Sequence, residues 1–320
     1  MKAAIVVDKE KIEIIEADEP DLAKYPEGAI KIKTELSAIC GSDIPRFVLE
    51  EDDYPGRLGT SIHEAIGTVT QSNSTRFSVG DRVLALPKEI GGCSEYFVSH
   101  EDVTVPLADF HSQEQILMSQ PLGTVIWAVR KLGPLFDKDI AIFGAGPIGQ
   151  MTAHTVSNLG ARTITVVDVV DFRLDVAKQM RATVTVNATR EDPLKRIEEI
   201  TDGRMADIAF EMVGHNTETI NTCIDAVKRL GTVLCFGVPD EDVYPIQYPK
   251  IIRKNISVIG SIGPEAQADF PLAMRWIVEG RIDVSPIITQ RMPFTEVQRG
   301  FEMFTRERDK SIKIVLEYPE

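Results

Sequence analysis

The stretch that decides the fold of this 320-residue chain is Asp139-Ile-Ala-Ile-Phe143-Gly144-Ala-Gly146-Pro147-Ile148-Gly149. An apolar run that predicts a strand leads into the pattern G-x-G-x-x-G, and a helical pattern follows. In such a unit Gly144 permits the tight turn, Gly146 lets the backbone approach a pyrophosphate, and Gly149 lets the helix pack closely on the strand. The amino terminus of the helix then faces the anion. The stretch predicts a dinucleotide-binding unit.

A second strand pattern, residues 163–167, ends in Asp168. An acid about twenty residues beyond the glycine pattern binds the ribose 2'-hydroxyl and repels a 2'-phosphate. We therefore expect NAD rather than NADP as the cofactor. Arg173 has two open interpretations, because it could line the adenine side of the cofactor or be a solvated helix residue.

Strand and helix patterns alternate through the second part of the chain. A helical stretch begins at Gln115 and is broken at Pro121; further helices are expected at Asp171–Met180 and Thr217–Leu230, with apolar residues facing the core. Strands are expected at residues 140–143, 163–167, 207–211, 232–237 and 256–260. This alternation predicts an α/β fold with a doubly wound parallel sheet of the Rossmann type.

The flanking parts of the chain differ from this pattern. Residues 1 to about 110 carry short strand signals punctuated by Gly, Pro, Asn and Asp, which predicts a mostly β unit. After about residue 262, a helix at Ala266–Glu279, a segment Phe294–Arg306 and a strand at residues 311–316 have no place in the dinucleotide sheet. We expect a discontinuous first domain, residues 1–122 and 263–320, with the NAD-binding domain, residues 123–262, inserted in it.

Composition excludes several functional classes. The formal charge of −14 and the pI near 4.9 argue against a nucleic-acid partner, which needs clustered Lys and Arg. No signal-peptide pattern and no apolar run long enough to span a bilayer is present, so no membrane partner and a cytoplasmic location are expected. The four cysteines are widely spaced and form no C-x-x-C pair, which suits a reducing compartment.

A second set of residues predicts a metal site. Cys40, His63 and Glu64 offer a thiolate, an imidazole and a carboxylate, and a catalytic zinc needs three protein ligands and an open position. The alternative for each segment alone is a buried cysteine or a structural histidine. The dinucleotide pattern downstream favours the metal site.

Taken together, five motifs resemble those of the zinc-dependent medium-chain dehydrogenases over nearly the whole chain: Cys40-Gly-Ser-Asp, His63-Glu64 with Gly67, Gly80-Asp-Arg-Val, Gly91-Gly-Cys-Ser-Glu-Tyr and the Gly144 pattern. The chain is most similar to the sorbitol (polyol) dehydrogenase branch and to galactitol-phosphate dehydrogenases within it. The resemblance implies a GroES-like catalytic domain, a Rossmann domain, and a homodimer or homotetramer.

The resemblance also implies the roles of residues around the metal. It makes Cys40, His63 and Glu64 the ligands of one catalytic zinc, Ser42 the hydroxyl that takes the substrate proton, and Asp43 the partner that orients His63. Ser42 and Asp43 could equally cap a helix.

The sequence departs from the family pattern in several places. Gln120 stands where the branch has Glu, and an amide is a weaker, neutral ligand. Pro45 replaces a relay histidine, the cysteine-rich lobe for a structural zinc is absent, and the spacing from Tyr54 to His63 is about three residues longer than usual.

For the cofactor, the resemblance implies Thr124 near the nicotinamide amide, Ile148 behind the nicotinamide ring, and Val213, Gly237 and Val238 beside it; Pro147 belongs to the same loop. The apolar members of this set could instead be simple core. Strand carboxyl ends are nevertheless where this fold binds its ligand.

The expected activity is a zinc- and NAD-dependent oxidation of a secondary alcohol, a polyol or polyol phosphate, so the partner is a small-molecule substrate. Arg46, just beyond the metal loop, is a candidate phosphate contact, and the alternative is a solvated surface arginine. Two other functions stay open: a threonine-type amino-alcohol or simple alcohol dehydrogenase, and a non-catalytic NAD-binding protein with a decayed zinc site.

Overall fold

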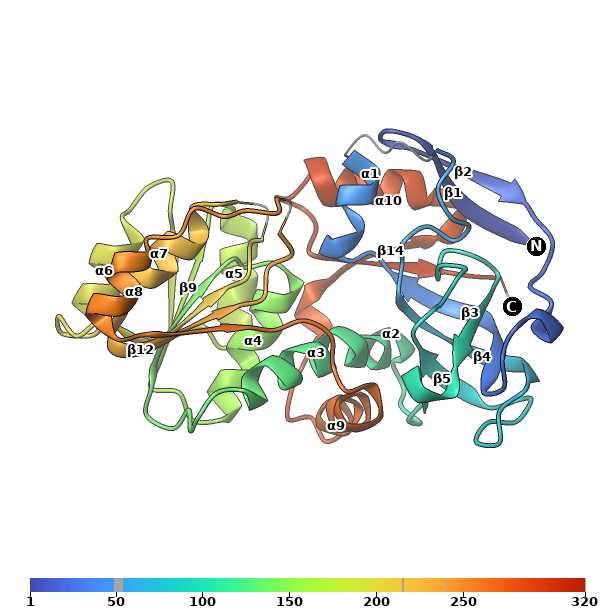
Figure 1. The fold of residues 1–320 in the computed structure, drawn as a ribbon, viewed down its shortest axis with the longest axis horizontal. Helices are drawn as coiled ribbons and strands as arrows, with labels where there is room; N and C mark the ends of the chain where they lie inside the picture. The colour runs from blue at the N-terminus through green and yellow to red at the C-terminus, as the bar shows by residue number, and fades with distance from the viewer. Residues whose placement is uncertain (49–53, 215, 240, 320) are drawn as a thin grey trace. The chain divides into compact units, whose positions relative to one another are not determined.

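The structure is a computed structural model that describes residues 1–48, 54–214, 216–239 and 241–319. The chain forms two compact units (Figure 1). Unit 1 contains Met1–Gly123, Glu265–Gly280 and Ile288–Glu320, and unit 2 contains Thr124–Pro264 and Arg281–Ile287. Unit 2 is therefore inserted between parts of unit 1.

The segment Arg281–Ile287 differs from expectation, because the sequence assigned everything after residue 262 to the first domain. Its backbone is bound to unit 2, where Asn158 donates a hydrogen bond of 2.5 Å to the Arg281 carbonyl. Tertiary contacts of this kind leave no local sequence signal.

Unit 2 is built on one parallel sheet of six strands in the order β10-β9-β8-β11-β12-β13. The strands are β8 (Asp139–Phe143), β9 (Thr163–Asp168), β10 (Val184–Asn187), β11 (Ala206–Glu211), β12 (Val227–Cys235) and β13 (Ser257–Gly260). The order reverses between β8 and β11, which is the switch point where ligands bind in doubly wound sheets. The predicted α/β fold with a doubly wound parallel sheet is confirmed.

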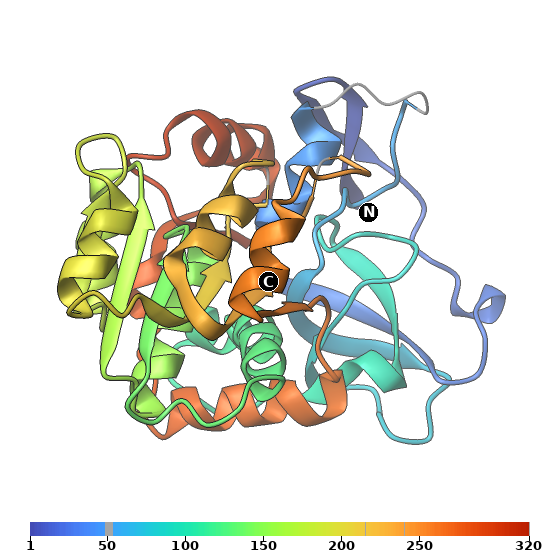
Figure 2. The same cartoon turned by 60° about the vertical axis from the view of Figure 1, so that its left-hand side comes forward.

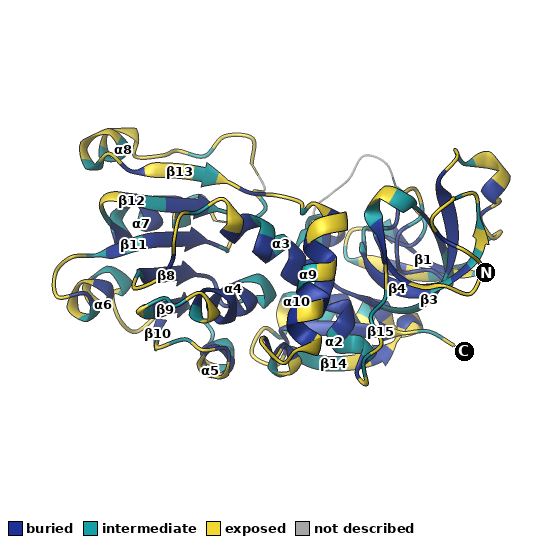
Figure 3. Ribbon diagram, turned by 90° about the horizontal axis from the view of Figure 1, so that it is seen from below, coloured by how far each residue is buried: buried dark blue, intermediate teal, exposed yellow. Residues whose placement is uncertain are grey.

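Helices pack on this sheet in two groups (Figure 2). The first group, α4 (Pro147–Asn158) and α5 (Asp171–Gln179), contacts β8, β9 and β10. The second group is α6 (Pro193–Ile200), α7 (Thr219–Ala226) and α8 (Tyr248–Lys254). The inner strands are buried, whereas the edge strand β13 is largely exposed (Figure 3).

The predicted helix Thr217–Leu230 was too long at its carboxyl end. Helix α7 ends at Ala226, and Val227 already pairs with Ala206 in the sheet. The helical spacing of apolar residues continues past Ala226, but the backbone from Val227 onward forms a strand because it pairs with β11. Strand β10 and helices α6 and α8 were not predicted.

Unit 1 is mostly β, as predicted. Its main sheet has the order β14-β15-β3-β4-β5-β7, with β6 also paired to β3, and a two-stranded sheet β1-β2 lies beside it. The strands are β1 (Lys2–Asp8), β2 (Lys11–Glu16), β3 (Ala29–Ala38), β4 (Glu64–Ser72), β5 (Arg82–Ala85), β6 (Tyr96–His100), β7 (Thr104–Pro106), β14 (Ile288–Pro293) and β15 (Lys313–Glu317).

The helices of unit 1 close its core. They are α1 (Pro45–Val48), α2 (Gln113–Leu117), α9 (Ala266–Val278) and α10 (Val297–Arg306), and α3 (Ser119–Arg130) crosses into unit 2. The rings of Phe47 and Phe301 lie 5.0 Å apart, so the metal loop is anchored by α1 against α10. This contact joins segments far apart in sequence.

The break that was predicted at Pro121 in this helical stretch lies instead between Leu117 and Ser119. Helix α2 ends at Leu117 and α3 begins at Ser119, so Pro121 occupies the first turn of α3. Proline is tolerated there because first-turn N–H groups have no partner within the helix. Among the described residues, no helix is long and apolar enough to cross a membrane.

Candidate metal centre and dinucleotide loop

Strand pairing brings the three predicted metal ligands together in unit 1. Ala38, at the end of β3, pairs with Glu64, at the start of β4. Because the strands are antiparallel, Cys40 emerges from β3 beside His63, which precedes β4. One ligand atom from each of Cys40, His63 and Glu64 lies within 4.8 Å of the others. Within the described part of the chain, this is the single group of three such side chains.

The donor set fits a zinc ion. Bond lengths of about 2.0–2.3 Å in a tetrahedron place ligand atoms about 3.5 Å apart, so only small side-chain movements separate the cluster from that geometry. The Glu64 side chain is buried, and its Oε2 has no hydrogen-bond partner in the structure. A buried carboxylate oxygen left without a donor is costly, and a cation would satisfy it.

Asp43 lies between His63 and the loop that carries Cys40. Its Oδ2 accepts a hydrogen bond of 2.8 Å from the Cys40 backbone N–H, and its Oδ1 lies 3.6 Å from His63 Nδ1. Desolvation lowers the pKa of His63, but interactions with Asp43 and Cys40 outweigh it and raise that pKa well above its usual value. Asp43 is buried, but His63 Nδ1 lies closer to the Ser61 carbonyl, at 3.3 Å, so the role of Asp43 in orienting the imidazole ring stays a prediction.

Lys313 is a member of the site that the sequence did not reveal. Its Nζ lies 2.6 Å from Glu64 Oε1 and donates a hydrogen bond of 3.1 Å to the Ile39 carbonyl. The Lys313 and Glu64 side chains are 1% and 0% exposed. Burial lowers the pKa of Lys313, but Glu64 and Cys40 outweigh it and raise that pKa above the ordinary value.

The other predicted residues of the catalytic loop lie on short elements. Ser42 is half-buried in the 3-10 turn Gly41–Asp43, and Pro45 begins α1. Arg46, on α1, is exposed and lines a pocket with Arg57, a residue that no sequence motif marks. Gln120 is 5% exposed in the first turn of α3. Its role as a ligand stays a prediction.

The glycine loop of unit 2 has the form expected for a dinucleotide. A Cβ on Gly149 would lie 1.9 Å from the Gly144 carbonyl oxygen, and Gly144 has a φ of +106°. Both positions therefore require glycine. A Cβ on Gly146 would meet nothing within 4 Å, so open space lies beside the loop at the amino terminus of α4, which begins at Pro147.

Asp168 lies against this loop. Its Oδ2 accepts a hydrogen bond of 2.7 Å from Ala145 N, and its Oδ1 accepts bonds from Val169 N and Val170 N at 2.7 and 3.0 Å. Three backbone donors hold the carboxylate in one orientation. The second strand is thereby joined to the turn that follows the first.

Most of the remaining cofactor candidates follow the carboxyl ends of the parallel strands. Ile148 is half-buried in the first turn of α4, and Arg173 is half-buried on α5. Val213 is 38% exposed, which excludes a simple core role. Gly237 follows β12 next to Val238, and its backbone packs on Gly214. Thr124 lies within α3, at the first residue of unit 2.

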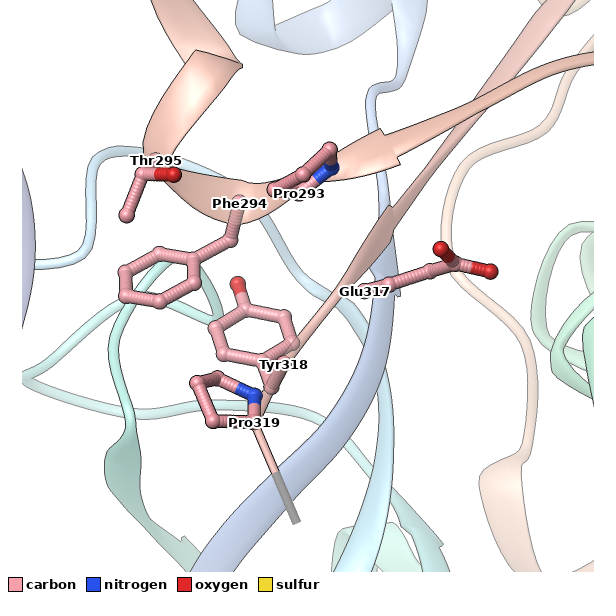
Figure 4. A pocket seen from close by; sticks show the side chains of 6 residues that line it. All are labelled: Pro293, Phe294, Thr295, Glu317, Tyr318 and Pro319. Carbon is pink, nitrogen blue, oxygen red and sulfur yellow. The ribbon is translucent and has the colours of Figure 1, made fainter.

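A second hollow of unit 1 does not contain these groups. It is lined by Pro293, Phe294, Thr295, Glu317, Tyr318 and Pro319 (Figure 4). The rings of Phe294 and Tyr318 stack with centroids 4.4 Å apart. The Tyr318 hydroxyl donates to the Gly92 carbonyl at 2.7 Å, so this hydroxyl joins the carboxyl-terminal segment to the loop that contains Gly92.

Comparisons with protein families match both units. Residues 26–109 match the family model "Alcohol dehydrogenase GroES-like domain", and residues 147–279 match "Zinc-binding dehydrogenase". The first matched range contains Cys40, His63 and Glu64. The second contains Gly149 and Asp168.

Comparisons with individual proteins extend over the full length. The chain is 26% identical to a sorbitol dehydrogenase of Bacillus subtilis (strain 168), covering 100% of this chain and 97% of the relative. It is 28% identical to an L-threonine 3-dehydrogenase of Marinomonas sp. (strain MWYL1), covering 90% and 92%. The structure of galactitol-1-phosphate dehydrogenase from Escherichia coli matches with a TM-score of 0.87 at 21% identity, covering 99% and 100%, which shows a shared fold.

Proposed function

We propose that this chain, which belongs to the zinc-dependent medium-chain alcohol dehydrogenase family, catalyses the reversible oxidation of a secondary alcohol by hydride transfer to NAD. The observation that carries the proposal is the cluster of Cys40, His63 and Glu64, whose ligand atoms lie within 4.8 Å of one another. The glycine loop with Asp168 supplies the second requirement, a site for the hydride acceptor.

Each residue of the metal loop has a proposed part in this chemistry. When bound, zinc supplies a Lewis acid that lowers the pKa of the alcohol, and NAD accepts the hydride. Cys40, His63 and Glu64 hold the metal, and Asp43 fixes the orientation of His63. The Ser42 hydroxyl takes the substrate proton. Gln120 assists as a weak fourth ligand or through water.

Proton release needs a route that avoids Pro45. Proline has no group that carries a proton, and it stands at the first residue of α1 in the place of a relay histidine. Ser42 is half-buried and lies three residues before Pro45. We propose that water reaches Ser42 and completes the route to solvent.

The proposed cofactor is NAD rather than NADP. Three backbone N–H groups hold the Asp168 carboxylate against the glycine loop, where it would accept the 2'-hydroxyl of the adenosine ribose and repel a 2'-phosphate. Arg173 lines the adenine side. Ile148, Val213, Gly237 and Val238 flank the nicotinamide ring with Thr124 at its amide, and Pro147 begins the helix that faces the pyrophosphate.

The proposed substrate is a polyol or a polyol phosphate. The sorbitol dehydrogenase relative favours a polyol, and the threonine dehydrogenase relative supports an amino alcohol as the second candidate. The candidate of another class is an NAD-binding protein with a decayed zinc site, which Gln120 and Pro45 support. The buried Glu64 Oε2 without a partner argues against decay, because an abandoned site gains stability by losing that group.

The proposed assembly is a soluble cytoplasmic homodimer or homotetramer with one catalytic zinc in each chain and no structural zinc. The edge strand β13 supports self-association, since it pairs only with β12 in the described sheet and exposes Val258. Ile262, just beyond the strand, is 82% exposed. Covering these apolar side chains would stabilise an oligomer.

The experiment follows NADH absorbance with zinc-loaded protein over free polyols, their phosphates, threonine and simple alcohols. Turnover confined to one class identifies the substrate family. Turnover that persists in a zinc-free Cys40→Ser variant refutes the proposed mechanism. Absence of both zinc binding and turnover in the unaltered protein supports the decayed-site candidate.

A further inference from the structure

A pocket of unit 1 next to the metal cluster contains two arginines. Its lining includes Arg46, Arg57, Tyr54, Thr60 and Ser61. It belongs to the same two loops as the metal ligands, because the Ser61 carbonyl lies 3.3 Å from His63 Nδ1 and Arg46 follows Asp43 by three residues. The pocket and the metal cluster therefore share two loops of unit 1.

Arg57 is held in place by neutral acceptors. Its Nε donates to the Thr60 carbonyl at 2.7 Å, and its Nη1 donates to the Lys88 carbonyl at 2.9 Å. These bonds fix the guanidinium without neutralising its charge. In the described part of the chain, neither Arg57 nor Arg46 has a carboxylate within 4.0 Å to form an ion pair.

The two guanidinium groups interact electrostatically. Desolvation by neighbouring atoms is the largest cause that lowers the pKa of Arg57, and Arg46 lowers it further, while Asp43 acts in the opposite direction. Two like charges lining one pocket repel, and a bound anion between them would remove that repulsion. The arrangement favours a ligand with more than one negative charge.

We propose that Arg46 and Arg57 together bind the phosphate monoester of a phosphorylated alcohol substrate. A phosphate monoester carries a charge of about −1.5 to −2 at neutral pH, which matches two guanidinium groups, whereas a carboxylate matches one. The guanidinium fork also suits phosphate oxygens geometrically. This inference rests on the proposed dehydrogenase function and narrows its substrate to the phosphorylated class.

The segment between the two arginines in the chain is acidic. It contains Glu50, Glu51, Asp52 and Asp53, which lie outside the described residues. Binding of phosphate to the whole protein therefore tests whether the two guanidinium groups are available to an anion in the presence of these carboxylates.

The first experiment measures binding of inorganic phosphate to the zinc- and NAD-loaded protein by calorimetry at constant ionic strength. We expect binding that is at least about tenfold weaker in Arg46→Ala and in Arg57→Ala, because each removes a charge-assisted hydrogen bond. Arg308→Ala is the matched control, since Arg308 is exposed and, among the described residues, also donates to a carbonyl, that of Thr305. It should bind phosphate like the unaltered protein.

Arg57→Lys covers the case in which Arg57→Ala fails to fold. It keeps the charge and loses the fork, so we expect phosphate affinity between those of the unaltered protein and Arg46→Ala. Equal phosphate affinity in all variants overturns the proposal, as does absence of binding. Acetate that binds as tightly as phosphate also overturns it and assigns the pocket to a carboxylate.

The second experiment compares kcat/KM for matched free and phosphorylated polyols. Arg46→Ala should lower kcat/KM for the phosphate about tenfold more than kcat/KM for the free polyol, and an equal loss for both substrates overturns the proposal. The phosphate-binding arm does not require turnover. Failure of the dehydrogenase function is therefore distinguishable from failure of the phosphate site.

Discussion

Replacing Lys313 tests the buried ion pair that supports the metal cluster. The Lys313→Met variant keeps the length of an unbranched side chain and removes the ammonium that lies 2.6 Å from Glu64 Oε1. Glu64 Oε2 already lacks a partner, so the variant leaves a buried carboxylate without any counter-charge from Lys313. We expect a marked loss of stability in the protein prepared without zinc.

The magnitude follows from the burial of both groups. Removing one partner of a buried pair costs about 3–5 kcal/mol, because the remaining charge is not solvated. At about 2–4 °C per kcal/mol, the melting temperature of the transition that includes unit 1 should fall by about 6–20 °C. Lys178→Met is the control, since its pair with Asp175 is exposed and should contribute less than about 1 kcal/mol.

Zinc should partly restore the Lys313→Met variant. A bound cation supplies the positive charge that the variant lacks, so zinc should raise the melting temperature of the variant more than that of the unaltered protein. The assay is thermal unfolding of metal-free protein with and without added zinc, together with zinc affinity from chelator competition. Neither measurement depends on turnover.

A double-variant cycle isolates the pair. Lys313→Met combined with Glu64→Gln removes both charges, and we expect it to be more stable than Lys313→Met alone, since neutral buried partners avoid the unpaired charge. A loss of stability in the double variant that equals the sum of the losses in the two single variants would refute the reasoning. Equal zinc-induced shifts in the variant and the unaltered protein would show that Lys313 does not act on the metal site through Glu64.

Three further predictions concern other parts of the molecule. Cys40→Ser should lose zinc and turnover together, as metal analysis and NADH absorbance would reveal, and zinc retained at full stoichiometry would contradict the ligand assignment. Asp168→Ser should weaken the preference for NAD over NADP by about tenfold or more in kcat/KM, and an unchanged ratio would remove Asp168 from the ribose site. Desolvation raises the pKa of Asp139, but hydrogen bonds from Arg162 and Thr163 outweigh it, so the pKa in the folded protein is lowered. The contribution of the Asp139 carboxylate to stability is therefore fully present above the unfolded pKa of about 3.9 and is lost as the pH falls through the lower folded pKa. Asp139→Asn should cost about 1.5–3 kcal/mol at pH 7 in urea unfolding, and this difference should shrink below about pH 4; a constant difference would refute it.

The sequence by itself determined the features that depend on local pattern. The run from Asp139 to Gly149 is a strand, a turn and a helix in the structure, and five of the six parallel strands were predicted. Cys40 and His63-Glu64 could be found because their residue types and motifs are distinctive. Local sequence carries this information, because periodicity and glycine positions act within a few residues.

Only the tertiary structure decided which distant charges meet. Lys313 and Glu64 are 249 residues apart, and they become neighbours because β15 pairs with β3 and β3 pairs with β4. Likewise, Arg57 lines one pocket with Arg46 although no spacing rule connects them. The end of α7 at Ala226 was also set by sheet pairing. Such contacts depend on strand order, which no local pattern encodes.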